Sequence, residues 1–551
     1  MINSNIKTVK INDLCFHTEH FGDRNNPTCL LIAGAMAPAR FWTDTFCNLI
    51  VNSGFFVIRY DHRDIGESCA VDWQMHPYTL SDLAGDAISI LDVYGIQQAH
   101  FVGHSMGGYI AQTIALEFPK NTQSICSISA GPIGATKDTD HPLTDEEQAT
   151  LAKTWEIMLS RQDDPSKETM IHSFLPIWKY LNGKFPFDEE MAYAYTKDLI
   201  LRSQHPIRAG NNHELVMRSL DIEKSRNILQ KVDLPNLIIQ GTADPLILPR
   251  NGVALSSAIP ESHLTMISGM GHMFFDRGLE KEIADLICSH MKNASRNTLE
   301  RNMLLHMTYF AGKMPQIKLL PQEDVAVIRS GISDDMFNYV LSARFTKENV
   351  ARRVDQVIHI FQEHDLPFSW WIGESDSPSD LKNELCQQGL MFKEKDVGMI
   401  LDLQSFSPKT ESQLHFKRVS SAEALKDFGD IILAIGGHRE CYERIYRHIP
   451  LSILQESSPL QMHIAYLGDR PIVSGILVLG DNMAGIYYVA TVPDERGKGY
   501  GTAMMEHLLN LAKQRGYFLA GLEASHEGLN LYKRLGFKEV CIFEEYAWTK
   551  Q

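Results

Sequence analysis

The amino-acid sequence predicts two folds in succession: an α/β fold with a mostly parallel sheet and a helical lid, followed by an α+β fold. Two observations lead to this prediction. In the first part of the chain, short apolar runs alternate with segments of helical periodicity, which indicates a parallel sheet with helices on both faces. In the last part, strand-like runs are joined by Gly-Asp turns, which is typical of an antiparallel meander.

Buried strands of the first part are predicted at five apolar runs. They are CLLIAG (29–34), FFVIRY (55–60), HFVG (100–103), SICSIS (124–129) and NLIIQG (236–241). From about 131 to 220 the chain is instead polar and favours helices, as in LTDEEQATLAKTWEIMLS. We therefore expect an inserted lid there rather than a continuation of the sheet.

One helix between these strands is predicted together with its two ends. Its apolar residues recur at helical spacing: Leu83, Ala87, Leu91 and Tyr94. Thr79 or Ser81 is the candidate N-cap, because a hydroxyl there accepts a hydrogen bond from a free backbone N–H of the first turn. Gly95 is the candidate stop.

The domain boundaries follow from where these patterns end. The first pattern ends near residue 293, which gives a first domain over 1–292 with a lid at about 131–220. The polar stretch NASRNTLERN opens a predicted linker at 293–312. A first half at 313–405 and a second half at 406–551 follow, the latter with three strands from 462, a helix at 502–515, a strand at 517–522 and a further helix.

An internal echo suggests that these two halves are related. The segments ELCQQGLMFKEKDVGMIL (384–401) and YKRLGFKEVCIFEEYAW (532–548) share one pattern. Each is read as the end of a helix, a glycine followed by Leu or Phe, and then a strand.

Composition narrows the classes of function. The 551 residues are 44% hydrophobic and carry a formal net charge of −16, which disfavours nucleic acid as a partner. The start lacks the apolar core of a secretory signal, and the apolar runs are too short to cross a membrane. The nine cysteines include no C-x-x-C, so neither a disulfide framework nor a metal site is expected. The simplest expectation is a cytoplasmic protein without a membrane partner.

The stretch FVGHSMGGYI (101–110) holds the motif G-x-S-x-G around Ser105. On a tight turn from strand to helix, Ser105 would project its hydroxyl as a nucleophile, and Gly103 and Gly107 would avoid a collision where strand and helix cross. The backbone N–H of Met106, at the helix start, would face a developing oxyanion. A second donor is expected near Ala35, after the strand LLIAG.

A serine nucleophile needs a base and an orienting carboxylate. Asp244 follows the apolar strand in NLIIQGTADP, and His272 lies in a glycine-flanked loop in MISGMGHMFF. We therefore expect Ser105, Asp244 and His272 to act together. His104 is expected to pack or to form a local hydrogen bond, and Asp61, His62 and Arg63 to tie down a turn.

These motifs, in the order Ser, Asp, His, resemble the α/β-hydrolase superfamily over residues 1–292. VIRYDHRDIGES (57–68), HPYTLSDLAGDAISILD (76–92) and GHSMGG resemble its aclacinomycin methylesterase branch. The resemblance implies a carboxylester hydrolase with Ser105 as nucleophile, Asp244 as acid and His272 as base. Among enzymes, a thioesterase, lactonase, amidase or cofactor-free peroxidase stays open. The lid does not match that branch's polyketide pocket, so the resemblance leaves the ester unspecified.

A second motif, R-x-x-G-x-G, lies between a strand and an amphipathic helix in VATVPDERGKGYGTAMMEHLL. Glycines there let successive backbone N–H groups converge on an anion at the helix start. The candidate anion-binding residues run from the motif arginine to the helix start: Arg496, Gly497, Lys498, Gly499, Tyr500, Gly501 and Thr502.

This second motif resembles the GNAT N-acetyltransferase superfamily, most strongly over 460–548. The resemblance implies that the loop holds the pyrophosphate of acetyl-CoA, the acyl donor, and that Tyr532 protonates the departing thiolate. The backbone of Thr491 and Val492 would pair with the pantetheine arm, and Ser525 stands where many members carry asparagine. The half at 313–405 lacks the loop and has Leu385 roughly where Tyr532 would be, so it resembles a degenerate copy that shapes the acceptor pocket.

The sequence thus predicts a bifunctional enzyme acting on small-molecule ester and amine substrates. The alternative is that one module is catalytic and the other only binds or tethers. A complete triad set and an intact loop with Tyr532 both favour the first interpretation.

Overall fold

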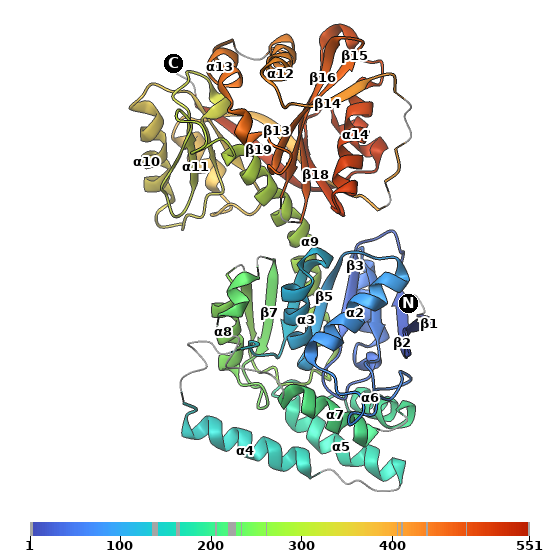
Figure 1. Ribbon diagram of the computed structural model, residues 1–551. Coiled ribbons are helices and arrows are strands. Elements are labelled where there is room, and N and C mark those ends of the chain that lie inside the picture. Colours follow the sequence, from blue (N-terminus) through green and yellow to red (C-terminus); the bar gives the residue numbers. More distant parts are fainter. Residues whose placement is uncertain are drawn as a thin grey trace. The chain divides into compact units, whose positions relative to one another are not determined.

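The chain folds as two compact units, Met1–Ala294 and Ser295–Gln551, in the computed structural model (Figure 1). The structure describes residues 4–134, 142–160, 166–203, 206–218, 227–232, 234–260, 262–404, 406–408, 412–436, 439–480 and 482–548. The predicted lid therefore lies partly outside the described residues. Among the described residues, no helix is long and apolar enough to cross a membrane.

The first unit is built on an eight-stranded sheet. In spatial order its strands are β1 (Asn5–Ile11), β2 (Leu14–Phe21), β4 (Phe56–Tyr60), β3 (Thr28–Ile32), β5 (Ala99–His104), β6 (Thr122–Ile128), β7 (Asn236–Gly241) and β8 (Ser262–Ile267). β1 and β2 pair antiparallel, and the strands from β4 to β8 pair parallel. The predicted mostly parallel sheet is confirmed.

Helices cover both faces of this sheet, because adjacent strand residues point to opposite sides. Leu31 packs in one apolar cluster with α1 (Asp44–Asn52) and α9 (Arg277–Thr308), whereas its neighbour Leu30 packs in another. The second cluster contains α2 (Leu80–Tyr94), α3 (Met106–Glu117) and α8 (Pro249–Ala258). Short 3-10 turns are η1 (Ala39–Phe41), η2 (Pro119–Asn121) and η3 (Ile228–Lys231).

Helix α2 resolves the choice between the two predicted N-caps. The Thr79 side chain accepts from Asp82 N–H, and the Asp82 carboxylate accepts from Thr79 N–H at 2.8 Å, which completes a capping box. Ser81 lies inside the helix. Gly95 ends it at φ 70°, in the left-handed region.

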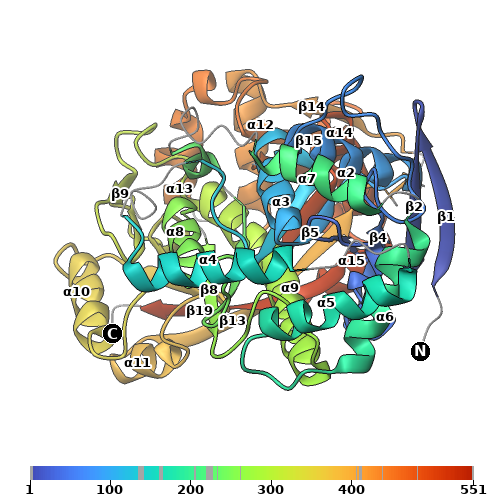
Figure 2. The ribbon, with the colours of Figure 1, turned by 90° about the horizontal axis from the view of Figure 1, so that it is seen from below.

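The predicted helical lid lies between β6 and β7. Its described helices are α4 (Asp145–Leu159), α5 (Lys167–Leu181), α6 (Glu189–Arg202) and α7 (Pro206–Arg218), seen together in Figure 2. Phe174 and Leu199 of the lid belong to the apolar cluster that contains Leu31, so the lid shares its core with the sheet of the first unit.

The second unit is built on an eleven-stranded sheet. In spatial order its strands are β14 (His415–Arg418), β15 (Leu460–Leu467), β16 (Arg470–Leu479), β17 (Ala484–Thr491), β18 (Leu519–Ala524), β13 (Met391–Asp402), β19 (Lys538–Trp548), β12 (Phe368–Ile372), β11 (Tyr339–Leu341), β10 (Ala326–Arg329) and β9 (Lys318–Leu320). The predicted meander is β15–β17, all antiparallel.

The helices of this unit are α10 (Val350–Gln362), α11 (Leu381–Gln387), α12 (Ala422–Ala434), α13 (Arg439–Arg444), α14 (Tyr500–Gln514) and α15 (Leu529–Leu535). Its 3-10 turns are η4 (Asp335–Phe337), η5 (Tyr446–His448), η6 (Leu451–Ile453) and η7 (Pro493–Glu495).

The two halves of the second unit have the same local geometry. Gly389 after α11 and Gly536 after α15 adopt φ 94° and 99°. Leu390 N–H donates to Leu385 C=O, and Phe537 N–H donates to Tyr532 C=O, both at 3.0 Å. The same helix ending leads into β13 and into β19, so Leu385 and Tyr532 occupy equivalent positions. The internal echo is therefore a structural repeat.

The halves exchange their last strands. β13 of the first half lies between β18 and β19, and β19 of the second half lies between β12 and β13. A boundary at 405/406 therefore does not separate two sheets, in contrast to the two successive halves expected from the sequence.

The predicted linker at 293–312 is also different in the structure. Helix α9 continues to Thr308, because Leu299 and Met303, four residues apart, bury their side chains in the second unit. Asn302 between them is 3% exposed and donates from Nδ2 to Met483 C=O at 2.9 Å. This stretch is therefore part of a helix rather than an irregular connection.

Candidate active sites

Ser105 stands at the turn between β5 and α3, in a backbone conformation that is rare for serine, with φ 53° and ψ −120°. A Cβ on Gly103 would overlap the Gly107 carbonyl, and a Cβ on Gly107 would overlap the Ile32 carbonyl. The two motif glycines are thus required by the close crossing of α3 over β5 and β3. The turn presents Ser105 at the carboxyl edge of the sheet.

The structure brings Asp244 and His272 together. His272 Nδ1 lies 3.0 Å from Asp244 Oδ2, and both residues are buried. Asp244 Oδ1 accepts from Leu246 N–H and Ile247 N–H, each at 2.9 Å, which fixes the carboxylate. This geometry orients the imidazole so that Nε2 is left for a proton from another group.

His104 supports His272 from the side of Ser105. Its Nε2 lies 2.8 Å from the His272 carbonyl oxygen, and the two rings are 4.9 Å apart. Burial lowers the pKa of His104 well below its ordinary value, so the ring is neutral and Nε2–H donates to that carbonyl. Within the described residues, the Ser105 hydroxyl forms no hydrogen bond to His272. Such bonds are often long in structures without substrate.

One candidate oxyanion donor, Met106, follows Ser105 in the chain, and the other, Ala35, follows Gly34. Met106 is the first residue of α3, where backbone N–H groups lack helical partners. Gly34 lies against the serine, since a Cβ on it would be 3.2 Å from Ser105 Cβ. Ala35, next in the chain, is exposed on a turn closed by a bond from Ala37 N–H to Gly34 C=O at 3.2 Å.

The loop after β4 connects Ala39, just after this turn, to the lid, as expected for a structural role. Asp61 is fully buried and accepts from Ala39 N–H at 2.7 Å, from Glu67 N–H at 3.1 Å and from Arg202 Nη2 of the lid at 3.1 Å. Arg63 holds Asp86 of α2 through two hydrogen bonds, at 2.8 and 2.6 Å. The loop is thereby anchored to the core.

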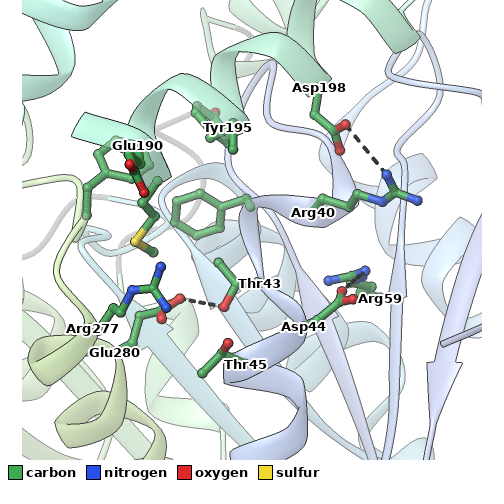
Figure 3. Close-up of a pocket in the computed structure, with 14 residues that line it drawn as sticks. Arg40, Thr43, Asp44, Thr45, Arg59, Glu190, Tyr195, Asp198, Arg277 and Glu280 are labelled. Atoms are coloured by element: carbon green, nitrogen blue, oxygen red, sulfur yellow. Dashed lines mark hydrogen bonds and ion pairs between the residues drawn. The ribbon is translucent and has the colours of Figure 1, made fainter. Parts of the chain in front are cut away.

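A pocket of about 470 Å³ lies between the lid helix α6 and the first turns of α1 and α9 (Figure 3). Phe41 lines it and stacks on His104, with ring centroids 4.6 Å apart. Glu280, 2% exposed, accepts a hydrogen bond from Thr43 Oγ1 at 2.7 Å. Burial raises the pKa of Glu280 to about 7. Ser105, Asp244 and His272 are not among its lining residues.

The second candidate site begins at the loop before α14. Gly497 and Gly499 adopt φ 77° and 84°, and Gly499 is the N-cap of the helix. Any side chain at either position would be strained, although space is open around both. Arg496 Nε donates to Thr491 C=O at 3.2 Å, and Lys498 Nζ pairs with Glu495 Oε2 at 2.8 Å. The exposed loop thus offers backbone donors at a helix start, which suits a pyrophosphate.

Strands β17 and β18 diverge next to this loop. They pair only at Ala484 with Ala520 and at Gly485 with Gly521, so the later part of β17 has a free edge toward β18. Val492 N–H donates to Ile472 C=O at 3.0 Å, on the other side of the strand. Because successive strand residues present their backbone groups to opposite sides, Thr491 and not Val492 faces the free edge. The expectation for Val492 is thus not supported.

Asp396 lies near the candidate Tyr532, and Glu523 lies near Asp396. Glu523 on β18 lies opposite Gly398 of β13, and Asp396, two positions earlier on β13, points to the same face. Glu523 Oε1 and Asp396 Oδ1 are buried and have no hydrogen-bond partner among the described residues. Burial and the nearby Asp396 raise the pKa of Glu523 to about 8 and that of Tyr532 to about 12. Ser525 is exposed just after β18, where its carbonyl accepts from Gly528 N–H at 3.1 Å.

On the side of the sheet that belongs to the first half, a buried carboxylate is paired: Glu545 of β19, a strand of the second half, lies opposite Trp371 of β12. Glu545 on β19 is 3% exposed and pairs with Lys393 Nζ at 3.1 Å, while the Ser369 hydroxyl also donates to it. Leu385, in the position equivalent to Tyr532, is fully buried in an apolar cluster. The first half therefore has an apolar side chain in the position of Tyr532 and an ion pair beside β12.

Comparisons with known proteins agree with both folds. Residues 30–279 match the family model of the alpha/beta hydrolase fold, and residues 435–537 match the model of the acetyltransferase (GNAT) family. The chain therefore carries an α/β-hydrolase domain followed by a GNAT acetyltransferase domain.

Two relatives of the first domain are rhodomycin D methylesterases. DauP of Streptomyces sp. strain C5 is 29% identical over 52% of this chain and 99% of its own length. DnrP of Streptomyces peucetius is also 29% identical, over 52% of this chain and 99% of its own length. A hydrolase structure from Pseudomonas aeruginosa PA01 aligns with 20% identity and a TM-score of 0.39, covering 52% of this chain and 98% of that one.

Sequence reasoning did not find several residues that line or support the sites. Asp396 was not among the candidates assigned. Glu523, near a strand end, was considered as a base that acts through water, but a structural role was favoured. His213 of the lid accepts a hydrogen bond from Met36 N–H, next to Ala35, and no sequence motif surrounds it. Its role depends on a contact between residues 177 positions apart.

Proposed function

We propose that the first domain is a serine carboxylester hydrolase. His272, oriented by Asp244, takes the proton of Ser105 as the serine attacks the ester carbonyl. The backbone N–H groups of Ala35 and Met106 stabilise the oxyanion, and water then releases the acyl group from Ser105. The hydrogen bond between His272 and Asp244, beside a serine on a strained turn, carries this proposal.

The names of the relatives suggest a methyl ester as the bond cleaved. Both are described as methylesterases, and they align over nearly their whole length with the first domain. We extend this class to the present chain as a proposal: a methyl ester of a carboxylic acid is hydrolysed to the acid and methanol.

Labelling with a fluorophosphonate tests the nucleophile. We expect one labelled site in the full chain and its loss in Ser105→Ala. Ser129→Ala is the matched control, because Ser129 follows the next strand, β6, and also has a positive φ of 49°. Labelling that persists in Ser105→Ala, or that is lost in Ser129→Ala alone, would contradict the assignment.

We propose that the second domain is an acetyl-CoA-dependent N-acyltransferase, so that the enzyme is bifunctional. The loop from Arg496 to Thr502 would hold the pyrophosphate, and Thr491 the pantetheine arm. Acetyl-CoA supplies the acyl group when bound. Tyr532, whose raised pKa keeps its hydroxyl protonated at neutral pH, would hold the proton needed by the departing thiolate.

Glu523 is proposed to accept the proton of the amine. Its carboxyl and that of Asp396 lack a cationic partner among the described side chains, whereas Glu545, where β19 pairs with β12 of the first half, has Lys393. An ammonium group of the acceptor would supply the missing positive charge, and Glu523 in its deprotonated form would remove the proton. The contrast between the two halves favours the second one as the active half.

Calorimetric titration with acetyl-CoA tests the loop. Gly499→Glu should abolish binding, because it strains the left-handed backbone and adds a negative charge beside the phosphates. Gly516→Glu is the control: it has φ 82° at the other end of α14 and the same added charge. Equal affinity of Gly499→Glu and the parent chain would place the donor elsewhere.

A further inference from the structure

The turn that carries the candidate oxyanion donor Ala35 is held from the lid. Met36 N–H donates to His213 Nδ1 at 3.0 Å, and His213 lies on α7, fully buried. A ring nitrogen that accepts from a backbone N–H carries no proton, so the proton is on Nε2, 3.3 Å from the Arg63 carbonyl. Burial lowers the pKa of His213 to about 4, which keeps this tautomer neutral.

The turn has a conformation that its own residues do not favour. Met36 has φ 64°, in the left-handed region that suits glycine. Gly34 and Ala37 close the turn, which places Met36 third, as in a type II turn. Turning over the peptide between Ala35 and Met36 would give a type I turn and return Met36 to a negative φ.

His213 opposes that change. Its Nδ1 can accept from Met36 N–H only while this peptide keeps its observed orientation. The ring of His62 lies 5.8 Å from that of His213. Nε2 of His62 is 3.0 Å from the carbonyl oxygen of Ala33, the residue just before the turn. The turn is thus fixed from both sides, and Gly34 within it lies against Ser105.

We propose that His213 is a positioning residue that sets the oxyanion hole from the lid. By holding the Ala35–Met36 peptide, it fixes the turn in which Gly34 lies against Ser105 and Ala35 carries the candidate donor. The lid is then part of the catalytic arrangement and not only a cover. This inference rests on the proposed hydrolase function, because it assigns a purpose to the turn only if an oxyanion forms there.

Steady-state hydrolysis of p-nitrophenyl esters by the full chain tests the proposal. His213→Leu removes the acceptor, and we expect kcat to fall by about tenfold or more with little change in KM, since an oxyanion donor acts in the transition state. His213→Asn keeps an acceptor near the position of Nδ1 and should retain more activity. A trifluoromethyl ketone, which forms an oxyanion on Ser105, should bind more weakly to His213→Leu by a similar factor.

A second substitution separates positioning from lid packing. Glycine adopts φ 64° without strain, so Met36→Gly should restore part of the lost kcat in the His213→Leu background. No restoration in a folded double variant, or an unchanged kcat in His213→Leu, would overturn the proposal. If the leucine variant does not fold, His213→Gln, which moves the acceptor, is compared with His213→Asn in the same way. Absence of both hydrolysis and fluorophosphonate labelling in the parent chain would instead refute the proposed function itself.

Discussion

Gly398 of β13 lies directly opposite Glu523 of β18, so a strand from the first half of the second unit borders the candidate transferase site of the second half. Asp396 is the next residue of β13 on that face, and its charge acts on Glu523. The half without a phosphate loop therefore supplies a carboxyl group to the other half's site.

The rate of acetyl transfer should depend on the ionisation of Glu523. Because its pKa is raised to about 8, the basic form is scarce at neutral pH and grows as the pH rises. We expect kcat/KM for an accepted amine to rise with a midpoint near pH 8 and to level off above about pH 9. Asp396→Asn removes the neighbouring negative charge and should move this midpoint to lower pH. Thiol release from acetyl-CoA measures the rate.

Two variants control that profile. Glu523→Gln should lose most of the rate at every pH, whereas Glu527→Gln, an exposed residue beyond β18, should match the parent chain. A midpoint that does not move in Asp396→Asn would show that the two carboxyl groups do not interact.

Fragment boundaries should matter more than the sequence suggests. A fragment of 295–551 keeps Leu299, Asn302 and Met303 of α9, which are buried in the second unit, and should bind acetyl-CoA. A fragment of 313–551 lacks them and should be less stable. Separate fragments of 313–405 and 406–551 should fail to fold alone, because each lacks a central strand. Circular dichroism and calorimetry distinguish these outcomes, and a stable 406–551 fragment would contradict the strand exchange.

Replacing Asn302 of α9 should lower the stability of the second unit. Its Nδ2 donates to Val478 C=O and Met483 C=O, at 3.3 and 2.9 Å, and its Oδ1 accepts from Tyr487 at 2.9 Å. Asn302→Leu leaves these groups unpaired and should cost about 2–4 kcal/mol. Scanning calorimetry should show a lower transition for the second unit, with fluorophosphonate labelling of the first unit unchanged.

Glu280 should make the first unit less stable as the pH rises. Its folded pKa of about 7 exceeds the ordinary 4.5, so the unfolded chain ionises first and stability falls between these pH values. Glu280→Gln keeps an acceptor for Thr43 and removes this loss. We expect it to stabilise the unit by about 1–3 kcal/mol at pH 8 and by nearly nothing at pH 4.

The control for this prediction lies in the same pocket. Glu190 is exposed and also lines it, so Glu190→Gln should have no comparable effect on the pH dependence (Figure 3). A stability difference for Glu280→Gln that is the same at both pH values would show that this carboxyl group has the same pKa in the folded and the unfolded chain.

Much of the fold could be predicted because strands buried on both faces have continuous runs of apolar residues. The five predicted strands correspond to β3–β7, each buried on both faces. β1 was not predicted, because at the edge of the sheet its residues are largely exposed. β9 and β11 span three residues each, too few for a periodic signal, and the strand exchange depends on pairing between distant segments.

The site could be predicted only where a residue belongs to a motif or follows an apolar strand. Ser105, Asp244 and His272 meet that condition, and the structure joins the last two. His213 and Asp396 do not, because each acts through a contact between segments far apart in the chain. The side of β17 on which Val492 presents its N–H depends on strand register, which its position in the sequence does not specify.

The exchange of β13 and β19 has a consequence for biosynthesis. During translation, β12 and β13 emerge long before β19, the strand that separates them, has been made. Until residues 538–548 leave the ribosome, β12 and β13 each have an unpaired edge that can pair with another nascent chain. The sheet of the second unit can therefore close only after residues 538–548 have emerged.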